Sequence, residues 1–90
     1  MSFKVDLTPR FKRAYKKLQP NEREAVQDAI RKLVKGSPYP NSLRVKKMQG
    51  HKSIWEASPT MSCRLTFEFN NPDYIVLRNV GKHDITLDNP

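Results

Sequence analysis

The chain has 90 residues, of which 37% are hydrophobic and 29% are charged, a composition typical of one small folded domain rather than a disordered chain. No apolar run is long enough to cross a membrane, the first ten residues lack the apolar stretch of a signal peptide, and a single cysteine excludes an internal disulfide. We therefore expect one cytoplasmic domain that covers residues 1–90.

The charge is unevenly distributed. Lys and Arg number 17 and Asp and Glu number 9, which gives a formal net charge of +8. Residues 1–52 hold 14 of the basic and 4 of the acidic side chains. An asymmetric basic surface attracts polyanions such as RNA, DNA, the ribosome or an acidic protein, although solubility alone is the plainer interpretation.

The chain begins with a strand and a short helix. Apolar and polar residues alternate over Phe3–Leu7, which predicts a half-buried strand. Thr8 followed by Pro9 is typical of an N-cap and a first helical residue. Apolar side chains then recur at helical spacing as far as Leu18. We expect a helix there whose other face carries a run of basic residues.

A second helix follows a break at Pro20. Asn21 and Glu24 have the spacing of a capping box, and the apolar residues after them form the strongest amphipathic stripe in the chain. Gly36 and Pro38 predict where this helix ends. Because the turn between the two helices is short, they should pack as an antiparallel hairpin.

The rest of the chain supplies strands. We expect them at Leu43–Met48, Ile54–Ala57, Ser62–Phe69 and Tyr74–Val80, with Gly81 ending the last one. The predicted fold class is α+β, in the order β-α-α-β-β-β-β, with a mainly antiparallel sheet and no final helix. The helical hairpin should cover one sheet face. The other face, which carries Arg64 and Thr66, should have no helix over it and is a candidate site.

Metal and cofactor chemistry find little support in the sequence. There are two histidines and one cysteine, no clustered carboxylates and no glycine-rich phosphate loop, so we expect neither a metal site nor a small-molecule cofactor. RNA cleavage without a metal requires only groups that transfer protons and cations that stabilise the phosphorane. Histidine suits the two proton transfers because its pKa lies near neutrality, and arginine suits the phosphorane because its fork matches two phosphate oxygens.

Three side chains are candidates for this chemistry. His83 follows the last strand, Arg64 lies on the strand before it, and His51 lies in a turn. Antiparallel pairing could bring His83 and Arg64 to one cleft. Its rim would be lined by four lysines, Lys46, Lys47, Lys52 and Lys82.

Plainer interpretations remain open for these residues. A histidine at a strand end is more often an ordinary surface residue, and a basic run on a helix is most often a solvated face. Arg64 could simply pair with Glu68 or Glu56. Trp55 and Phe67 are expected in the core rather than as platforms for stacking bases.

Three segments together resemble a known family. They are R-V-K-K-M-Q-G-H at residues 44–51, C-R-L-T-F-E-F at 63–69 and Y-I-V-L-R-N-V-G-K-H-D at 74–84. In this order, after a strand and a helical hairpin, they resemble the RelE/ParE superfamily of toxins from type II toxin–antitoxin systems. The resemblance covers nearly the whole chain and is closest to the histidine-bearing, RelE-like branch.

The resemblance implies a function. RelE-like toxins enter the ribosomal A site and cut mRNA without a metal, and a cognate antitoxin blocks them. It assigns phosphate stabilisation to Arg64 and proton transfer to His83. RNA binding is assigned to basic residues around the second and third strands, here Lys46, Lys47, His51 and Lys52.

The chain also departs from the family pattern. It has no tyrosine after Tyr74, and Cys63 stands where a tyrosine usually precedes the arginine. Two other functions stay open. A ParE-like toxin would inhibit DNA gyrase by contacts alone, and a non-toxic module would only bind nucleic acid.

Overall fold

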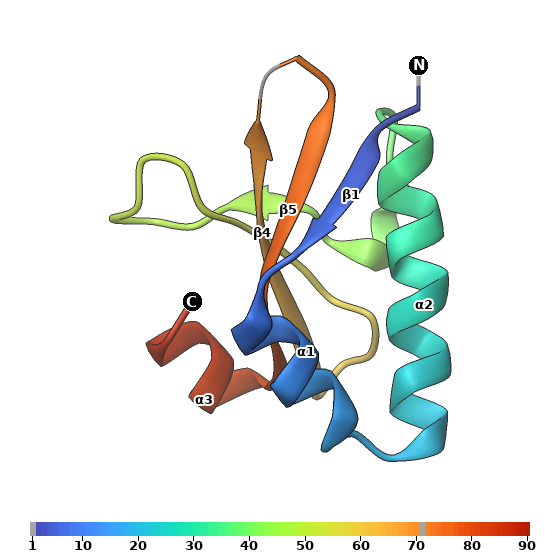
Figure 1. Ribbon diagram of the computed structural model, residues 1–90, viewed down its shortest axis with the longest axis vertical. Coiled ribbons are helices and arrows are strands. Elements are labelled where there is room, and N and C mark those ends of the chain that lie inside the picture. Colours follow the sequence, from blue (N-terminus) through green and yellow to red (C-terminus); the bar gives the residue numbers. More distant parts are fainter. Residues whose placement is uncertain (1, 71) are drawn as a thin grey trace.

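The computed structural model describes residues 2–70 and 72–90 and contains one sheet and three α-helices (Figure 1). None of the described helices is long and apolar enough to cross a membrane. The predicted order β-α-α-β-β-β-β is confirmed, with one added helix at the end. The elements are β1 (Lys4–Leu7), α1 (Pro9–Lys16), α2 (Pro20–Lys35), the 3₁₀ turn η1 (Asn41–Leu43), β2 (Lys46–Lys47), β3 (Trp55–Ala57), β4 (Cys63–Asn70), β5 (Tyr74–Lys82) and α3 (His83–Asp88).

The five strands form one mixed sheet in the order β1-β5-β4-β3-β2. β4 and β5 make a long antiparallel hairpin at its centre, with an irregularity between Thr66 and Phe67. β3 and β2 extend the sheet antiparallel on one side, and β1 joins β5 in parallel on the other. Because β1 pairs only with the first half of β5, from Tyr74 to Leu77, the second half of β5 has no strand on that side.

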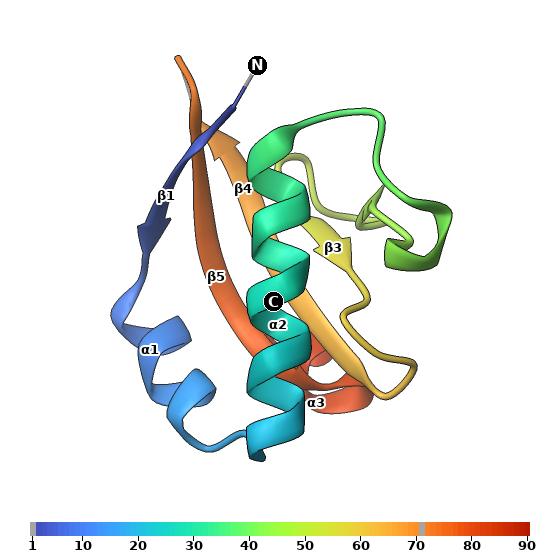
Figure 2. The same ribbon diagram turned by 90° about the vertical axis from the view of Figure 1, so that its right-hand side faces the viewer.

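The hydrophobic core lies between α2 and the sheet (Figure 2). Val26, Ala29 and Leu33 form the buried stripe of α2, as the helical spacing predicts. Phe67 is fully buried and Trp55 packs partly buried against the core, so both are core residues as expected. Burying each large apolar side chain contributes about 1.5–3 kcal/mol, and this makes the α2–sheet interface the main source of stability.

The predicted start of α1 is confirmed. The Oγ1 of Thr8 accepts a hydrogen bond from the backbone N–H of Phe11 at 3.1 Å and donates one to the carbonyl of Leu77 at 2.9 Å. One hydroxyl group therefore caps α1 and ties it to β5.

The predicted capping box at Asn21 and Glu24 is wrong. α2 already begins at Pro20, and the Glu22 side chain accepts a hydrogen bond from the backbone N–H of Gln19 at 3.0 Å. A proline costs nothing at the first helical position, since its missing N–H would have no helical partner there. Pro20 therefore opens α2 rather than only closing α1.

The predicted strand at Leu43–Met48 is reduced to Lys46–Lys47. Leu43 closes η1 with its side chain buried, and Arg44 adopts a left-handed conformation with φ 51°. A left-handed residue cannot continue an extended strand. The strand therefore begins only after this turn, at Lys46.

The predictions that no helix follows β5 and that the second sheet face is open are both wrong. β5 continues through Gly81 to Lys82, and α3 then folds back against β4 and β5 (Figure 1). A Cβ atom on Gly81 would lie 3.0 Å from the Oγ1 of Thr86, so the glycine permits this close approach. Thr66 is fully buried on this face, and Arg64 is only 9% exposed.

Candidate functional site

Arg64 is a buried cation held by backbone carbonyl groups. Its Nη1 donates to the carbonyls of Thr60, Met61 and Cys63 at 3.1, 3.0 and 2.9 Å. The ion pair with Glu68 or Glu56 that the sequence left open is not formed. Glu68 instead pairs with Arg78, and Glu56 approaches Lys46. Since a buried charge normally needs a charged partner, a carbonyl-bound guanidinium remains able to attract an anion.

Arg64 also lines a cavity of about 390 Å³, named here the Arg64 pocket. A second arginine, Arg44, lines the same pocket, and no carboxylate does. Among the described residues, the Nη2 and Nε atoms of Arg64 have no hydrogen-bond partner. Two guanidinium groups beside hydroxyl groups can bind an oxyanion such as a phosphate. The full lining is Ser42, Arg44, Ser58, Pro59, Thr60, Met61 and Arg64.

His83 begins α3 at the end of β5. Its backbone N–H donates to the carbonyl of Ser62 at 2.9 Å, which fixes the residue against the start of β4. Its ring Nδ1 lies 2.7 Å from a carboxylate oxygen of Asp84, so Nε2 is the nitrogen available for proton transfer. The side chain is half exposed and lines a cavity of about 330 Å³, named here the His83 hollow, together with Lys82.

Arg64 and His83 are neighbours in the sheet but do not share a cavity. The Cα of Arg64 pairs with that of Gly81, two residues before His83. The predicted antiparallel proximity is therefore present in the backbone. The side chains nevertheless line different cavities, the Arg64 pocket and the His83 hollow. A substrate that touches both must span the end of β4.

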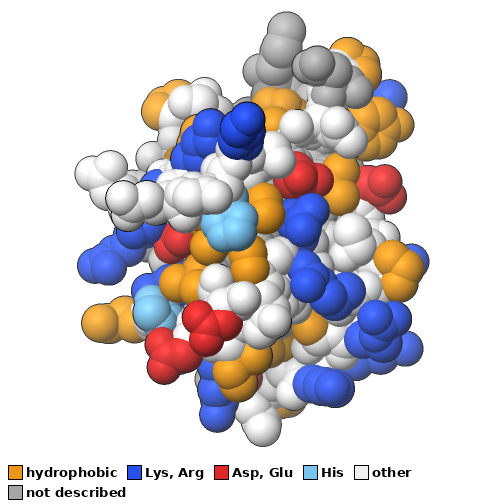
Figure 3. Space-filling view, turned by 90° about the vertical axis from the view of Figure 1, so that its left-hand side faces the viewer, with side chains coloured by type: hydrophobic (Ala, Val, Ile, Leu, Met, Phe, Trp, Pro, Cys, Tyr) orange, Lys and Arg blue, Asp and Glu red, His pale blue; other side chains and the backbone are white. Residues whose placement is uncertain are grey.

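The remaining predicted residues lie around β2 and the turn after it. His51 is exposed in the turn between β2 and β3, and Lys52 beside it is exposed as well. Lys46 and Lys47 occupy β2, the edge strand, which β3 and β4 separate from β5. Both histidines appear on the face of the molecule shown in Figure 3. His51 therefore lies on the same side of the protein as His83 (Figure 3), whereas the strand that holds Lys46 and Lys47 is separated from β5 by two strands.

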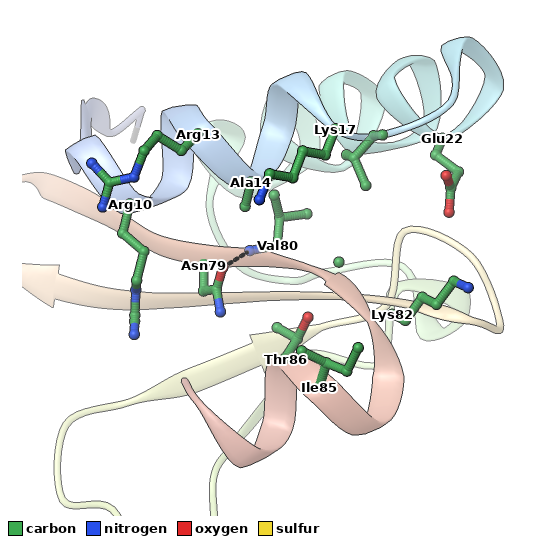
Figure 4. Close-up of a pocket in the computed structure, with 12 residues that line it drawn as sticks. Arg10, Arg13, Ala14, Lys17, Glu22, Asn79, Val80, Lys82, Ile85 and Thr86 are labelled. Carbon is green, nitrogen blue, oxygen red and sulfur yellow. Dashed lines mark hydrogen bonds between the residues drawn. The ribbon is translucent and has the colours of Figure 1, made fainter.

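A further basic site was not predicted. A cavity of about 440 Å³, named here the basic groove, lies between α1, the end of β5 and α3 (Figure 4). Its cations are Arg10, Arg13, Lys17 and Lys82, and Glu22 is its one carboxylate. Lys and Arg side chains also gather on the α1 side of the face in Figure 3.

The sequence contains a signal for this groove. Arg10, Arg13 and Lys17 follow the spacing i, i+3, i+7, which places them on one face of α1. The interpretation of residues 10–17 as one solvated helix face does not distinguish these three cations from the other basic residues of the run. What the spacing does not show is that α3 supplies the opposite wall.

The described residues hold no cluster of three side chains able to bind a metal. The only thiol, Cys63, is fully buried, and burial raises its pKa to about 11, with a further contribution from the charge of Glu22. A thiol in that state carries almost no thiolate near neutral pH. Cys63 is therefore a core residue rather than a nucleophile.

No family model matches the sequence, and no curated protein matches it either. Solved structures match its fold. A copper-bound mutant toxin from Helicobacter pylori has a TM-score of 0.80 and 21% identity, covering 92% of this chain and 97% of that one. YafQ in the E. coli DinJ–YafQ toxin–antitoxin complex has a TM-score of 0.80 and 13% identity, covering 94% and 97%.

A free mutant form of the E. coli toxin RelE also matches, with a TM-score of 0.74 and 17% identity. The match covers 96% of this chain and 88% of RelE. The protein therefore has the fold of RelE-type and YafQ-type toxins along nearly its whole length.

Proposed function

We propose that this protein is the toxin of a type II toxin–antitoxin system, and that it inhibits translation by cutting mRNA on the ribosome without a metal. The observation that carries the proposal is the fold, which is shared over at least 92% of the chain with the toxins named above. The site adds suitable chemistry, because His83 stands beside Lys82 and follows by two residues Gly81, the strand partner of Arg64.

The cleavage step follows from these groups. A base takes the proton of a ribose 2′-hydroxyl, and that oxygen attacks the adjacent phosphorus. The bond to the 5′-oxygen breaks, and an acid protonates the leaving oxygen, so the products are a cyclic phosphate and a 5′-hydroxyl. His83 serves one of the two proton transfers through Nε2, with Asp84 holding Nδ1. His51 is the second candidate for a proton transfer.

Arg64 and the lysines stabilise the charge that develops on phosphorus. The Nη2 and Nε atoms of Arg64 face no described protein acceptor, so they can donate to phosphate oxygens while Nη1 keeps its carbonyl partners. Lys46, Lys47 and Lys52 hold RNA on the β2 side, and Lys82 holds it beside His83.

We also propose a cognate antitoxin as partner. The matching structures include YafQ with DinJ, and RelE with RelB from Methanococcus jannaschii. An acidic antitoxin would complement the basic surface of this chain and block access to RNA.

Inducing the wild-type chain and the His83→Ala variant in bacteria, followed by mapping of mRNA 5′ ends, tests the function. New ends within translated frames that disappear in the variant are expected. The His51→Ala variant, induced in parallel, shows whether the second histidine is also required. Growth arrest without new mRNA ends would favour a gyrase inhibitor, and absence of arrest would favour a non-toxic nucleic-acid binder.

A further inference from the structure

We propose that the basic groove binds the sugar–phosphate backbone of single-stranded RNA outside the cleavage position. The inference rests on the proposed function, because it extends the RNA path away from His83. It assigns a binding role to Arg10 and Arg13 of α1 and to Lys17, the C-cap of that helix. These residues lie on the opposite side of β5 from the predicted lysines of β2.

The groove cations have free charge to offer. Among the described residues, Arg13, Lys17 and Lys82 form neither an ion pair nor a side-chain hydrogen bond, and all three are exposed. Glu22, the one carboxylate of the lining, already accepts a hydrogen bond from the backbone N–H of Gln19. The fourth cation, Arg10, donates hydrogen bonds to the backbone oxygens of Arg78 and Pro90 and keeps its charge. Four positive charges and one carboxylate therefore line the groove, which favours a polyanion over a neutral ligand.

The cations are spaced along the groove. Seven residues of α-helix separate Arg10 from Lys17, so their backbones lie about 10 Å apart along α1. Lys82 stands on the other wall, with the start of α3 beneath it (Figure 4). An extended phosphate chain can touch successive cations in such an arrangement, whereas a single small anion would use only one or two.

The groove adjoins the His83 hollow. Lys82 lines both cavities, together with Glu22 and Ile85. A third cavity of about 610 Å³ also contains Lys82 and Lys17 and extends to Ser62, which itself lines the His83 hollow. A strand whose reacting phosphate lies at His83 can therefore continue past Lys82 into the basic groove.

The lining favours RNA over an acidic peptide. The basic groove contains no aromatic side chain, so it suits contacts to phosphates rather than stacking of bases. An amphipathic acidic helix needs an apolar row to pack against. The cavity on the other side of α1, with Leu7, Phe11, Tyr15 and Ile30 in its lining, provides such a row, and the basic groove does not.

The test measures binding of a single-stranded RNA oligonucleotide by fluorescence anisotropy over a range of salt concentrations. All proteins carry His83→Ala, so that the oligonucleotide is not cut during the measurement. Arg13→Gln with Lys17→Gln removes two groove charges. Lys12→Gln with Lys16→Gln is the matched control, because it removes two charges from the same helix at residues that line the apolar cavity instead.

The groove variant should bind RNA more weakly and lower the slope of log affinity against log salt by about 1.4, since each single-strand phosphate contact contributes about 0.7. The control should keep the parental slope. Equal losses in both variants would mean diffuse attraction, and an unchanged groove variant would mean that RNA does not enter; either overturns the proposal. Poly-glutamate serves as the acidic-peptide probe in the same assay. If the groove variant loses poly-glutamate binding but keeps RNA binding, the proposal is also overturned, in favour of a protein site.

Failure of the proposed function would look different. If the wild-type chain cuts no mRNA but the groove variant still loses RNA binding selectively, the groove assignment stands and the nuclease assignment does not. Thermal unfolding of all variants checks the fold, which should be unaffected because the substituted side chains are exposed.

Discussion

Arg64 is buried and His83 is half exposed. Substitutions at the two residues should therefore differ in their effects on stability. Arg64 is buried, and its Nη1 satisfies the carbonyls of Thr60, Met61 and Cys63. Replacing it with alanine should lower the free energy of unfolding by about 1–3 kcal/mol, because the buried bond to Cys63 and the partly buried bonds to Thr60 and Met61 lose their donor. Urea unfolding measures this change. An unchanged midpoint would show that the carbonyls have other partners.

His83 should behave in the contrary way. Its side chain is half exposed, and its only described side-chain partner is the exposed Asp84. The His83→Ala substitution should therefore change stability by less than about 0.5 kcal/mol. Cleavage of translated mRNA should nevertheless fall by about 10²–10⁴, the typical contribution of a positioned acid or base. Single-turnover kinetics on programmed ribosomes provide the measurement, and full retention of activity would exclude His83 from the chemistry.

Cys63 makes stability depend on alkaline pH. Burial raises its pKa from 9.0 to about 11 in the folded protein. Below pH 9 both states keep the proton, so stability is unaffected. Above it the unfolded chain ionises first, and the free energy of unfolding should fall by about 1.4 kcal/mol per pH unit until the folded thiol also ionises. The difference in stability between wild type and Cys63→Ala, followed from pH 8 to pH 11, isolates this effect.

Among the elements, α3 depends on one glycine. A Cβ at Gly81 would press against the Oγ1 of Thr86, which is itself buried, and the φ of +157° disfavours a side chain. Gly81→Ala should lower stability by about 1–3 kcal/mol, as expected for overpacking. In the double variant with Thr86→Ala, the combined loss should be smaller than the sum of the single losses. Strict additivity in urea unfolding would show that the two residues do not press on each other.

The helical hairpin and the β4–β5 hairpin could be predicted because each has a local signal. Thr8 and Pro9 mark a helix start, and alternation over Cys63–Phe69 marks a strand with a buried face. α3 has no such signal. It is six residues long, too short to be stable alone, and its one buried side chain is Thr86. It exists because β4 and β5 are there to pack against, which no local pattern reveals.

The same distinction applies to the site. The proximity of Arg64 to the end of β5 followed from antiparallel pairing of two recognisable strands. The basic groove required the positions of α1 and α3, which lie more than sixty residues apart in the chain. The spacing of three cations predicts its α1 stripe, but not the opposite wall or the lining residues that the groove shares with the His83 hollow. The carbonyl partners of Arg64 could not be predicted for a different reason, since they depend on the conformation of the loop just before β4.

For the molecule as a whole, the charge asymmetry becomes a spatial one. The basic side chains within residues 1–52 contribute to two separate basic surfaces, one on α1 and one on β2. β4 and β5 supply the centre of the sheet. If RNA contacts the four groove cations, the salt slope of the His83→Ala protein should be at least about 2.8. Affinity should then fall roughly 50-fold between 50 and 200 mM salt. A slope near 1 in the anisotropy titration would contradict a multi-phosphate contact.

The parallel pairing of β1 with β5 has a consequence for how the protein is made. Lys4 pairs with Tyr74, so β1 can join the sheet only after β5 has been synthesised. Closing so long a loop is entropically costly and slows folding, since non-local contacts must form before they stabilise anything. During synthesis, a chain that has not yet supplied residues 74–82 has neither this sheet nor the His83 hollow. The His83 hollow should therefore form late in folding, after β5 has been made.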